Sequence, residues 1–179
     1  MKSKNIVIVY TTLYRNGGDK FKLVAETMAR EKSSENTEVL CQAIESKADL
    51  KEIFNHTSQI DELHFVGHSG MYGPMFGTVK YPEQFSPYEL QHLDIPFSTD
   101  GEAYFHCCRS ARWFAPYFSR VQGVKTYGYH WYTSFSSRKD KYSLPTFSRS
   151  SDLYCFGCPG KKISWLDSYN QKTTRANET

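Results

Sequence analysis

Two short segments carry the side chains that nucleophilic catalysis needs. His68 follows an apolar run in FVGHSG (65–70), and the pair Cys107-Cys108 follows another in AYFHCC (103–108). A thiol is only weakly ionised at neutral pH, and a nearby imidazole or helix N-terminus favours the nucleophilic thiolate. A cysteine that lies next to a histidine is therefore the minimum nucleophile–base pair for acyl transfer.

Strands and helices alternate around these two segments. Short runs of β-branched and aromatic residues predict strands at about residues 5–10, 37–44, 61–67, 102–107 and 123–131. The spacing of apolar residues predicts helices at about residues 20–32, 46–54, 87–92 and 110–120. Alternation of this kind predicts a parallel sheet with right-handed crossovers and with helices on its faces.

The predicted topology brings the two segments together. In a parallel α/β sheet the active crevice lies outside the carboxyl ends of the strands. Because His68 and Cys107-Cys108 follow the third and fourth strands, adjacent strands would place them side by side, although about 40 residues separate them. The Gly- and Pro-rich connection at 70–100 is as long as functional loops are. A helix starting near Ser110 would add a second influence that favours a thiolate.

In their order and strand context, the two motifs resemble those of the caspase-like cysteine peptidases. This family includes caspases, metacaspases, legumain, separase and bacterial relatives. The matching blocks are LHFVGHSG (63–70) and AYFHCCRSA (103–111), and the resemblance covers roughly residues 4–135. It implies a three-layer α/β/α fold whose mainly parallel sheet has five to six strands, with the spatial order 2-1-3-4-5.

The resemblance also implies roles for single residues. Aligning Cys-Cys-Arg-Ser with the family pattern Ala-Cys-Arg-Gly makes Cys108 the nucleophile and Cys107 its small buried neighbour. His68 would be the catalytic histidine. Backbone N–H groups near Ser69, Gly70 and Cys108 would form the oxyanion hole that stabilises a tetrahedral intermediate.

Two positions depart from the family pattern. Ser69 stands where the family usually has Gly, and Ser110 stands where caspases have Gly. The implied activity is that of a cysteine endopeptidase, a thiol protease that hydrolyses a polypeptide substrate through an acyl-enzyme. Such a dyad by itself needs neither a metal nor an organic cofactor.

Other functions stay open at this stage. The cysteines could be inert buried thiols in a caspase-fold domain that only binds partners. The segment GHSG (67–70) partly matches the nucleophile elbow of a small serine hydrolase with Ser69 as nucleophile, although Met71 breaks the motif. Thr11-Thr12 after the first strand and the glycine-rich 67–77 segment partly match the loops that hold FMN in flavodoxin-like proteins.

Charge is distributed unevenly along the chain. Residues 1–108 hold ten basic and fifteen acidic residues, and residues 109–179 hold twelve basic and four acidic ones. A basic C-terminal third can attract an acidic partner or substrate, and nucleic acid is the less expected partner. The segment Trp131–Lys141 would lie beside the nucleophile after the fifth strand. Within it Arg138 is the candidate that recognises a substrate carboxylate, since guanidinium binds carboxylates through two parallel hydrogen bonds.

Composition and length bound the remaining possibilities. The 179 residues are 39% hydrophobic and predict one domain over residues 1–168, followed by a flexible tail at 169–179. No apolar run approaches the ~18 residues of a membrane helix. The N-terminal segment lacks signal-peptide features, and five cysteines show no disulfide spacing, so we expect a cytoplasmic protein. The CxxC at 155–158 lacks the two further ligands that a zinc site requires.

Overall fold

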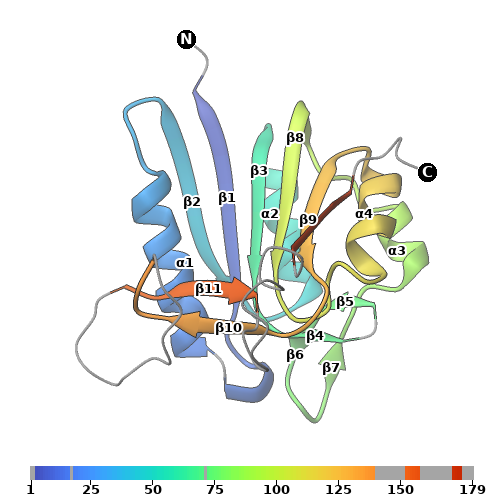
Figure 1. The fold of residues 1–179 in the computed structure, drawn as a ribbon. Coiled ribbons are helices and arrows are strands. Elements are labelled where there is room, and N and C mark those ends of the chain that lie inside the picture. The colour runs from blue at the N-terminus through green and yellow to red at the C-terminus, as the bar shows by residue number, and fades with distance from the viewer. Residues whose placement is uncertain (1–2, 17, 71, 140–151, 158–170, 175–179) are drawn as a thin grey trace.

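The computed structural model describes residues 3–16, 18–70, 72–139, 152–157 and 171–174. Its central sheet contains β2 (Thr37–Ile44), β1 (Lys4–Thr11), β3 (Ile60–Val66), β8 (Phe97–His106) and β9 (Lys125–Tyr129), in that spatial order (Figure 1). Neighbours among these strands all run parallel. The predicted three-layer α/β fold and the order 2-1-3-4-5 are confirmed.

A sixth strand closes one edge of the sheet. The strand β12 (Gln171–Thr174) pairs antiparallel with β9, with Gln171 opposite Tyr129. The sequence places these residues in a flexible tail, and the structure differs at this point. An edge strand such as β9 presents a row of unpaired backbone groups, so a polar segment without an apolar pattern can join the sheet through its backbone alone.

Helices cover both faces of the sheet. On one face, α1 (Gly18–Lys32) packs against β1, β2 and β3. On the other face lie α2 (Lys47–His56), α3 (Pro87–Gln91) and α4 (Phe114–Gln122) (Figure 1). Ser46 caps α2 in a capping box with Asp49, which satisfies two otherwise unpaired N–H groups of the first turn. In the described part of the chain, no helix is long and apolar enough to cross a membrane.

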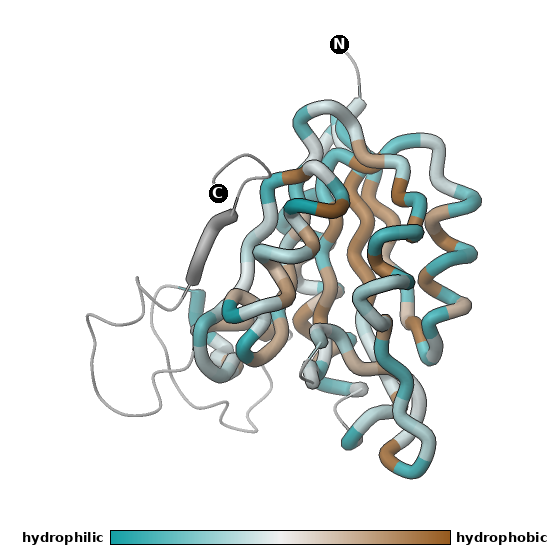
Figure 2. Tube along the Cα trace, turned by 90° about the vertical axis from the view of Figure 1, so that its right-hand side faces the viewer, coloured by the Kyte–Doolittle hydropathy of each residue, from teal (hydrophilic) through white to brown (hydrophobic). Residues whose placement is uncertain are grey.

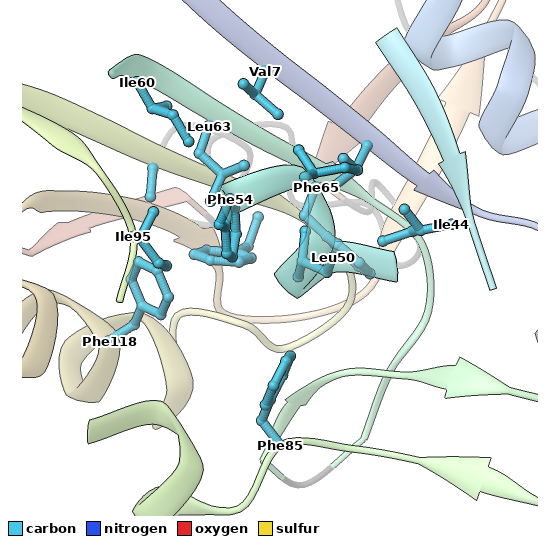
Figure 3. Close-up of a cluster of buried hydrophobic side chains, with 14 of the residues drawn as sticks. Val7, Ile44, Leu50, Phe54, Ile60, Leu63, Phe65, Phe85, Ile95 and Phe118 are labelled. Atoms are coloured by element: carbon cyan, nitrogen blue, oxygen red, sulfur yellow. The ribbon is translucent and has the colours of Figure 1, made fainter. Parts of the chain in front are cut away.

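The larger apolar core lies between the sheet and α2, α3 and α4. Figure 3 shows Phe65 of β3, Phe54 of α2 and Phe118 of α4 in one cluster of buried side chains, with Phe118 beside Ile95. The ring of Phe105 packs edge-on against those of Phe114 and Phe118, with centroids 4.6 and 4.9 Å apart. The hydrophobic residues concentrate on the central strands, and the outer loops are hydrophilic (Figure 2). Burial of this kind is the main force that holds the strands in place.

The connection at 70–100 is more ordered than a loop. It forms two short hairpins and then α3, the hairpins being β4 (Ser69–Gly70) with β5 (Gly73–Pro74) and β6 (Phe76–Gly77) with β7 (Pro82–Glu83). Phe76 and Phe85 are buried in the larger core. These anchors hold the connection against the carboxyl edge of the sheet.

A two-stranded ribbon lies on the α1 side. It consists of β10 (Thr133–Ser136) and β11 (Tyr154–Gly157), which pair antiparallel. In Figure 1 the ribbon crosses in front of the sheet near the lower ends of the strands. Phe135 contacts Phe21 of α1 with ring centroids 5.8 Å apart. This contact fixes the ribbon to the helix, close to the carboxyl ends of β1 and β3.

A chain of buried polar groups links β3 to β8 on the α1 face. Glu62 accepts hydrogen bonds from Lys4 and Lys32 at 2.6 Å and from His64 Nε2 at 2.9 Å. The His64 hydrogen bond and the two lysines hold the pKa of Glu62 well below its usual range. Burial disfavours the charged form of both His64 and His106. In a neutral His64 whose Nε2 donates to this carboxylate, Nδ1 accepts from His106 Nε2 at 3.1 Å. The two hydrogen-bonded histidines thus join the two strands.

The two histidines make the fold sensitive to acid. Burial lowers the pKa of His64, and it lowers that of His106 to about 3, below the ordinary value of 6.5. As the pH falls below 6.5, the unfolded chain binds protons that the folded chain does not, so the free energy of unfolding decreases. Each histidine contributes a slope of up to about 1.4 kcal/mol per pH unit.

We expect His106→Gln to reduce this pH dependence by about one proton. Urea unfolding followed by circular dichroism between about pH 4 and about pH 7 measures the slope. The matched control is His56→Gln, because His56 is exposed at the end of α2. An unchanged slope in His106→Gln would show that the buried pair does not control acid stability.

Candidate active site

The carboxyl ends of β3 and β8 lie side by side. The register pairs Val66 with His106, so His68 and Cys108 each follow a paired position by two residues. Two hydrogen bonds join the segments beyond the strands. Gly67 N–H donates to the His106 carbonyl at 3.5 Å, and the Ser69 hydroxyl donates to the Cys108 carbonyl. The predicted juxtaposition of the two motifs is thus present in the structure.

His68 and Cys108 line one cleft of about 230 Å³. Its other walls come from the segment after β1, from the start of α1 and from β10. The lining residues are Arg15, Lys20, Phe21, Gly67, His68, Cys108, Thr133 and Phe135. Gly67 is needed here because a Cβ at this position would lie 2.6 Å from Thr11 Oγ1. The close approach of β1 and β3 at Gly67 sets the floor of the cleft.

The imidazole of His68 is half-buried between two aromatic rings. Its centroid lies 5.0 Å from that of Phe21 and 5.7 Å from that of Tyr14, both in edge-on geometry. Burial lowers the pKa of His68, and the nearby Arg15 guanidinium lowers it further. At neutral pH the ring is therefore uncharged, and an uncharged imidazole can accept a proton from a thiol.

The thiol of Cys108 contacts β10. Its Sγ accepts a hydrogen bond from the backbone N–H of Thr133 at 3.3 Å and lies 3.4 Å from the Thr133 hydroxyl. The segment before β10 is tied to the residues after the thiol, since Arg109 N–H donates to the Trp131 carbonyl at 2.6 Å. These bonds explain why the segment that starts at Trp131 lies beside Cys108, as the sequence predicts.

The two adjacent cysteines differ in their surroundings. Cys107 is fully buried and faces the larger core, and burial raises the pKa of its thiol far above the ordinary range. Cys108 points to the opposite side, toward the cleft. Successive residues of an extended chain alternate in direction, so only one of the two thiols can reach a substrate.

One expectation about this region is wrong. The sequence predicts a helix from Ser110, directly after the thiol, but α4 begins only at Phe114. The reason is a tight turn in which Arg109 adopts a left-handed conformation with φ 58°. The Ser110 hydroxyl fixes this turn by donating to the carbonyls of Phe105 and Cys107 at 3.0 and 2.9 Å.

Two of the three proposed oxyanion-hole residues lie in the first hairpin. Ser69 and Gly70 form β4, which pairs with β5, and neither lines the cleft among the described residues. Their N–H groups, with that of Cys108, stay a prediction. The hairpin also bears on the serine-hydrolase alternative. A nucleophile elbow requires a helix directly after the serine, and Ser69 is followed by a strand pair instead.

Three cleft residues were missed by the sequence analysis. Arg15, Lys20 and Phe21 belong to the segment after β1 and to the start of α1. The turn-like residues after the first strand were a usable signal, because the first strand neighbours the third and its carboxyl end lies at the same edge. Arg138, by contrast, is exposed and does not line the cleft among the described residues.

A larger hollow lies at the opposite edge of the sheet. It has a volume of about 710 Å³ and is lined in part by Lys4, Asp61, Glu62, Asp100 and Glu102. These residues sit near the amino ends of β1, β3 and β8. None of the residues lining this hollow is a cysteine or a histidine, and active crevices of parallel α/β sheets lie at the carboxyl edge. The smaller cleft is therefore the candidate active site.

The described residues contain neither a cluster of metal ligands nor, at Thr11 and Thr12, exposed hydroxyls for a flavin phosphate. Within the described ranges, no three His, Cys, Asp or Glu side chains cluster as a metal site would require. Of the CxxC pair, Cys155 is described and Cys158 lies outside the described residues. The hydroxyls of Thr11 and Thr12, which motivate the FMN alternative, are shielded from solvent. A flavin phosphate would not reach them in this conformation.

The Ser110 side chain forms hydrogen bonds that fix the backbone next to Cys108. Its hydroxyl also accepts the N–H of Tyr129 at 3.1 Å, so one side chain joins β8 to β9 beneath Cys108. We expect Ser110→Ala to lower the free energy of unfolding by about 1–3 kcal/mol, because it leaves a buried N–H without a partner. Urea unfolding measures the loss. Ser33→Ala removes an exposed hydroxyl and should change stability by under about 0.5 kcal/mol; equal losses in both variants would contradict the assignment.

Two comparisons with known proteins were negative. No protein-family model matches the chain, and no curated protein matches it with significant similarity. The likeness to caspase-like peptidases therefore depends on the two segments 63–70 and 103–111 and on the cleft at which they meet.

Proposed function

We propose that the protein is a cysteine endopeptidase of the caspase-like type, with His68 and Cys108 as its catalytic dyad. The observation that carries this proposal is that both side chains line one cleft at the carboxyl ends of adjacent parallel strands. Of the two adjacent thiols, only that of Cys108 lines the cleft. A thiol and an uncharged imidazole at one such edge are the groups that acyl transfer requires.

The proposed mechanism uses the dyad twice. His68 takes the proton of the Cys108 thiol, and the sulfur attacks the carbonyl carbon of the scissile peptide bond. The resulting tetrahedral oxyanion is held by backbone N–H groups near Ser69, Gly70 and Cys108. The oxyanion collapses to a thioester as His68 protonates the departing amine. Water, deprotonated by His68, then hydrolyses the thioester and restores the thiol.

The proposal fits a reducing compartment such as the cytoplasm. The described cysteines, Cys41, Cys107, Cys108 and Cys155, are all free thiols. A nucleophilic thiol must stay reduced to act, and cytoplasmic glutathione and thioredoxin keep thiols in that state.

The walls of the cleft favour an acidic substrate side chain. Arg15 and Lys20 supply two positive charges, and no carboxylate occurs among the lining residues. The Arg15 guanidinium lies over the ring of Tyr14, 5.3 Å from its centroid, and its backbone has a left-handed φ of 54°. Held conformations of this kind often mark functional positions. Arg15 thus replaces Arg138 as the leading candidate for recognising a carboxylate.

Single substitutions test the dyad. We expect Cys108→Ala and His68→Ala each to abolish peptide cleavage, because each removes one half of the nucleophile–base pair. Cys107→Ala should keep most of the activity, since its thiol is sealed in the core. Cleavage of a fluorogenic peptide library measures activity, and circular dichroism establishes that the variants are folded.

The outcomes separate the alternatives. If Cys108→Ala is active and Cys107→Ala is inactive, the nucleophile is Cys107 and not Cys108. Cleavage by both cysteine variants would contradict the dyad. If the wild-type chain neither cleaves peptides nor reacts with an electrophilic peptide probe, the protein is an inactive interaction domain of the same fold.

Substrate preference tests the charge of the cleft. We expect cleavage after Asp or Glu, and we expect Arg15→Gln to lower kcat/KM for such peptides about tenfold by removing a charge-assisted hydrogen bond. Arg138→Gln is the matched control and should change kcat/KM by less than about twofold. A preference for Lys or Arg before the scissile bond in the wild-type protein would refute the assignment.

A further inference from the structure

The contact between Cys108 and Thr133 assigns a role to a residue outside the dyad. Thr133 is the first residue of β10 and offers two groups to the sulfur. Its backbone N–H donates to Sγ at 3.3 Å, and its hydroxyl oxygen lies 3.4 Å from Sγ. Both distances are in the range of hydrogen bonds to sulfur, and hydrogen bonds to a charged acceptor are the stronger ones.

A thiolate at position 108 requires hydrogen-bond donors that stabilise its negative charge. The helix expected to begin at Ser110 would have supplied them, but α4 begins at Phe114. The N–H and hydroxyl of Thr133 in β10 lie within hydrogen-bond distance of the sulfur instead. An N–H dipole aimed at a thiolate stabilises it in the same way as a helix N-terminus does.

We propose that Thr133 is a positioning residue of the peptidase: its N–H and hydroxyl hold the Cys108 sulfur in the cleft and stabilise its thiolate. This inference rests on the proposed function of Cys108 as nucleophile. Thr133 acts on the sulfur and not on the substrate, so it is distinct from the dyad.

The partner strand offers the Thr133 hydroxyl a second sulfur. Cys155 of β11 forms a side-chain hydrogen bond with Thr133, and burial raises the pKa of its thiol to about 12. Cys155 therefore keeps its proton at neutral pH and is an uncharged, weak acceptor. The single hydrogen of the Thr133 hydroxyl therefore donates preferentially to a charged Cys108 sulfur, because hydrogen bonds to ions are the stronger ones.

The backbone around Thr133 is fixed on two sides. Thr133 lies opposite Gly157 in the β10–β11 ribbon. On the other side, Arg109 N–H donates to the carbonyl of Trp131 at 2.6 Å. Because both anchors are backbone contacts, a side-chain substitution at Thr133 should leave the N–H in place and remove only the hydroxyl.

Other ionisable groups surround the sulfur and must be held constant in a test. His68, Arg15 and Lys20 share the cleft with Cys108. Cys107 precedes it in the chain, and Cys155 lies beyond Thr133. A variant at Thr133 leaves all five side chains in place, and Cys155 loses only its hydrogen bond with the Thr133 hydroxyl.

The test measures the reactivity of Cys108 without any peptide. Iodoacetamide alkylation of the wild-type protein, Thr133→Val and Thr133→Ser is followed over a range of pH, and tandem mass spectrometry separates Cys108 from Cys107. We expect Thr133→Val to move the pH midpoint of Cys108 alkylation upward by about one unit, the loss expected for one hydrogen bond to a charged group. Thr133→Ser keeps the hydroxyl and should keep the wild-type midpoint. Thr133→Ala replaces the valine variant if circular dichroism shows that the latter is unfolded.

The outcomes distinguish this inference from the proposed function. An unchanged midpoint in Thr133→Val, or an equal shift in Thr133→Ser, overturns the role of the hydroxyl even if the wild-type protein cleaves peptides. The expected shift in a protein that cleaves no peptide supports the role of Thr133 on the thiolate and refutes the peptidase. With cleavage present, Thr133→Val should lower kcat at neutral pH and recover toward wild-type kcat at higher pH, which a general loss of structure would not do.

Discussion

The parallel pairing of β3 with β8 is the interaction on which the candidate site depends. In this pairing Val66 lies opposite His106. The register therefore determines where His68 and Cys108 lie, because each follows a paired residue by two positions. Side chains alternate along a strand, so a slip of one residue would exchange the faces of Cys107 and Cys108. Cys108, the proposed nucleophile, would then be buried, and Cys107 would face the cleft. The chemistry of the cleft is therefore a consequence of strand register.

Two different kinds of contact secure that register. On one face, aromatic side chains such as Phe65 and Phe105 pack under α2 and α4 and provide most of the apolar burial. On the other face, Glu62, His64 and His106 form a hydrogen-bonded chain between the strands. Apolar packing tolerates small shifts, but a shifted register would separate His64 from His106 and leave buried ring nitrogens without a hydrogen-bond partner, at a cost in free energy. The apolar face thus provides most of the stability, and the polar face favours one register of β3 against β8.

The cleft is assembled from segments that are distant in the chain. Arg15 comes from the turn after β1, His68 and Cys108 come from the ends of β3 and β8, and Thr133 comes from the ribbon that crosses the α1 side. Each segment is held by its own anchor. Phe21 of α1 contacts both the ring of His68 and that of Phe135, so one aromatic side chain joins the proposed general base to the strand that contacts the Cys108 thiol.

The sequence by itself determined the alternation of strands and helices, the parallel sheet with helices on both faces and the pairing of His68 with the cysteine segment, because hydrophobic periodicity is a local property of the chain. The order of the strands followed only from the resemblance of the two motifs to those of the caspase-like peptidases. Only the tertiary structure decided the rest of the cleft. The start of α4 at Phe114 depends on the hydrogen bonds of Ser110 to β8 and β9, and the contact of Thr133 with Cys108 depends on a ribbon whose two strands are separated by residues 137–153. Likewise, Arg15 and not Arg138 lines the cleft because β1 is the neighbour of β3. Contacts of this kind join residues far apart in sequence, and no local pattern encodes them.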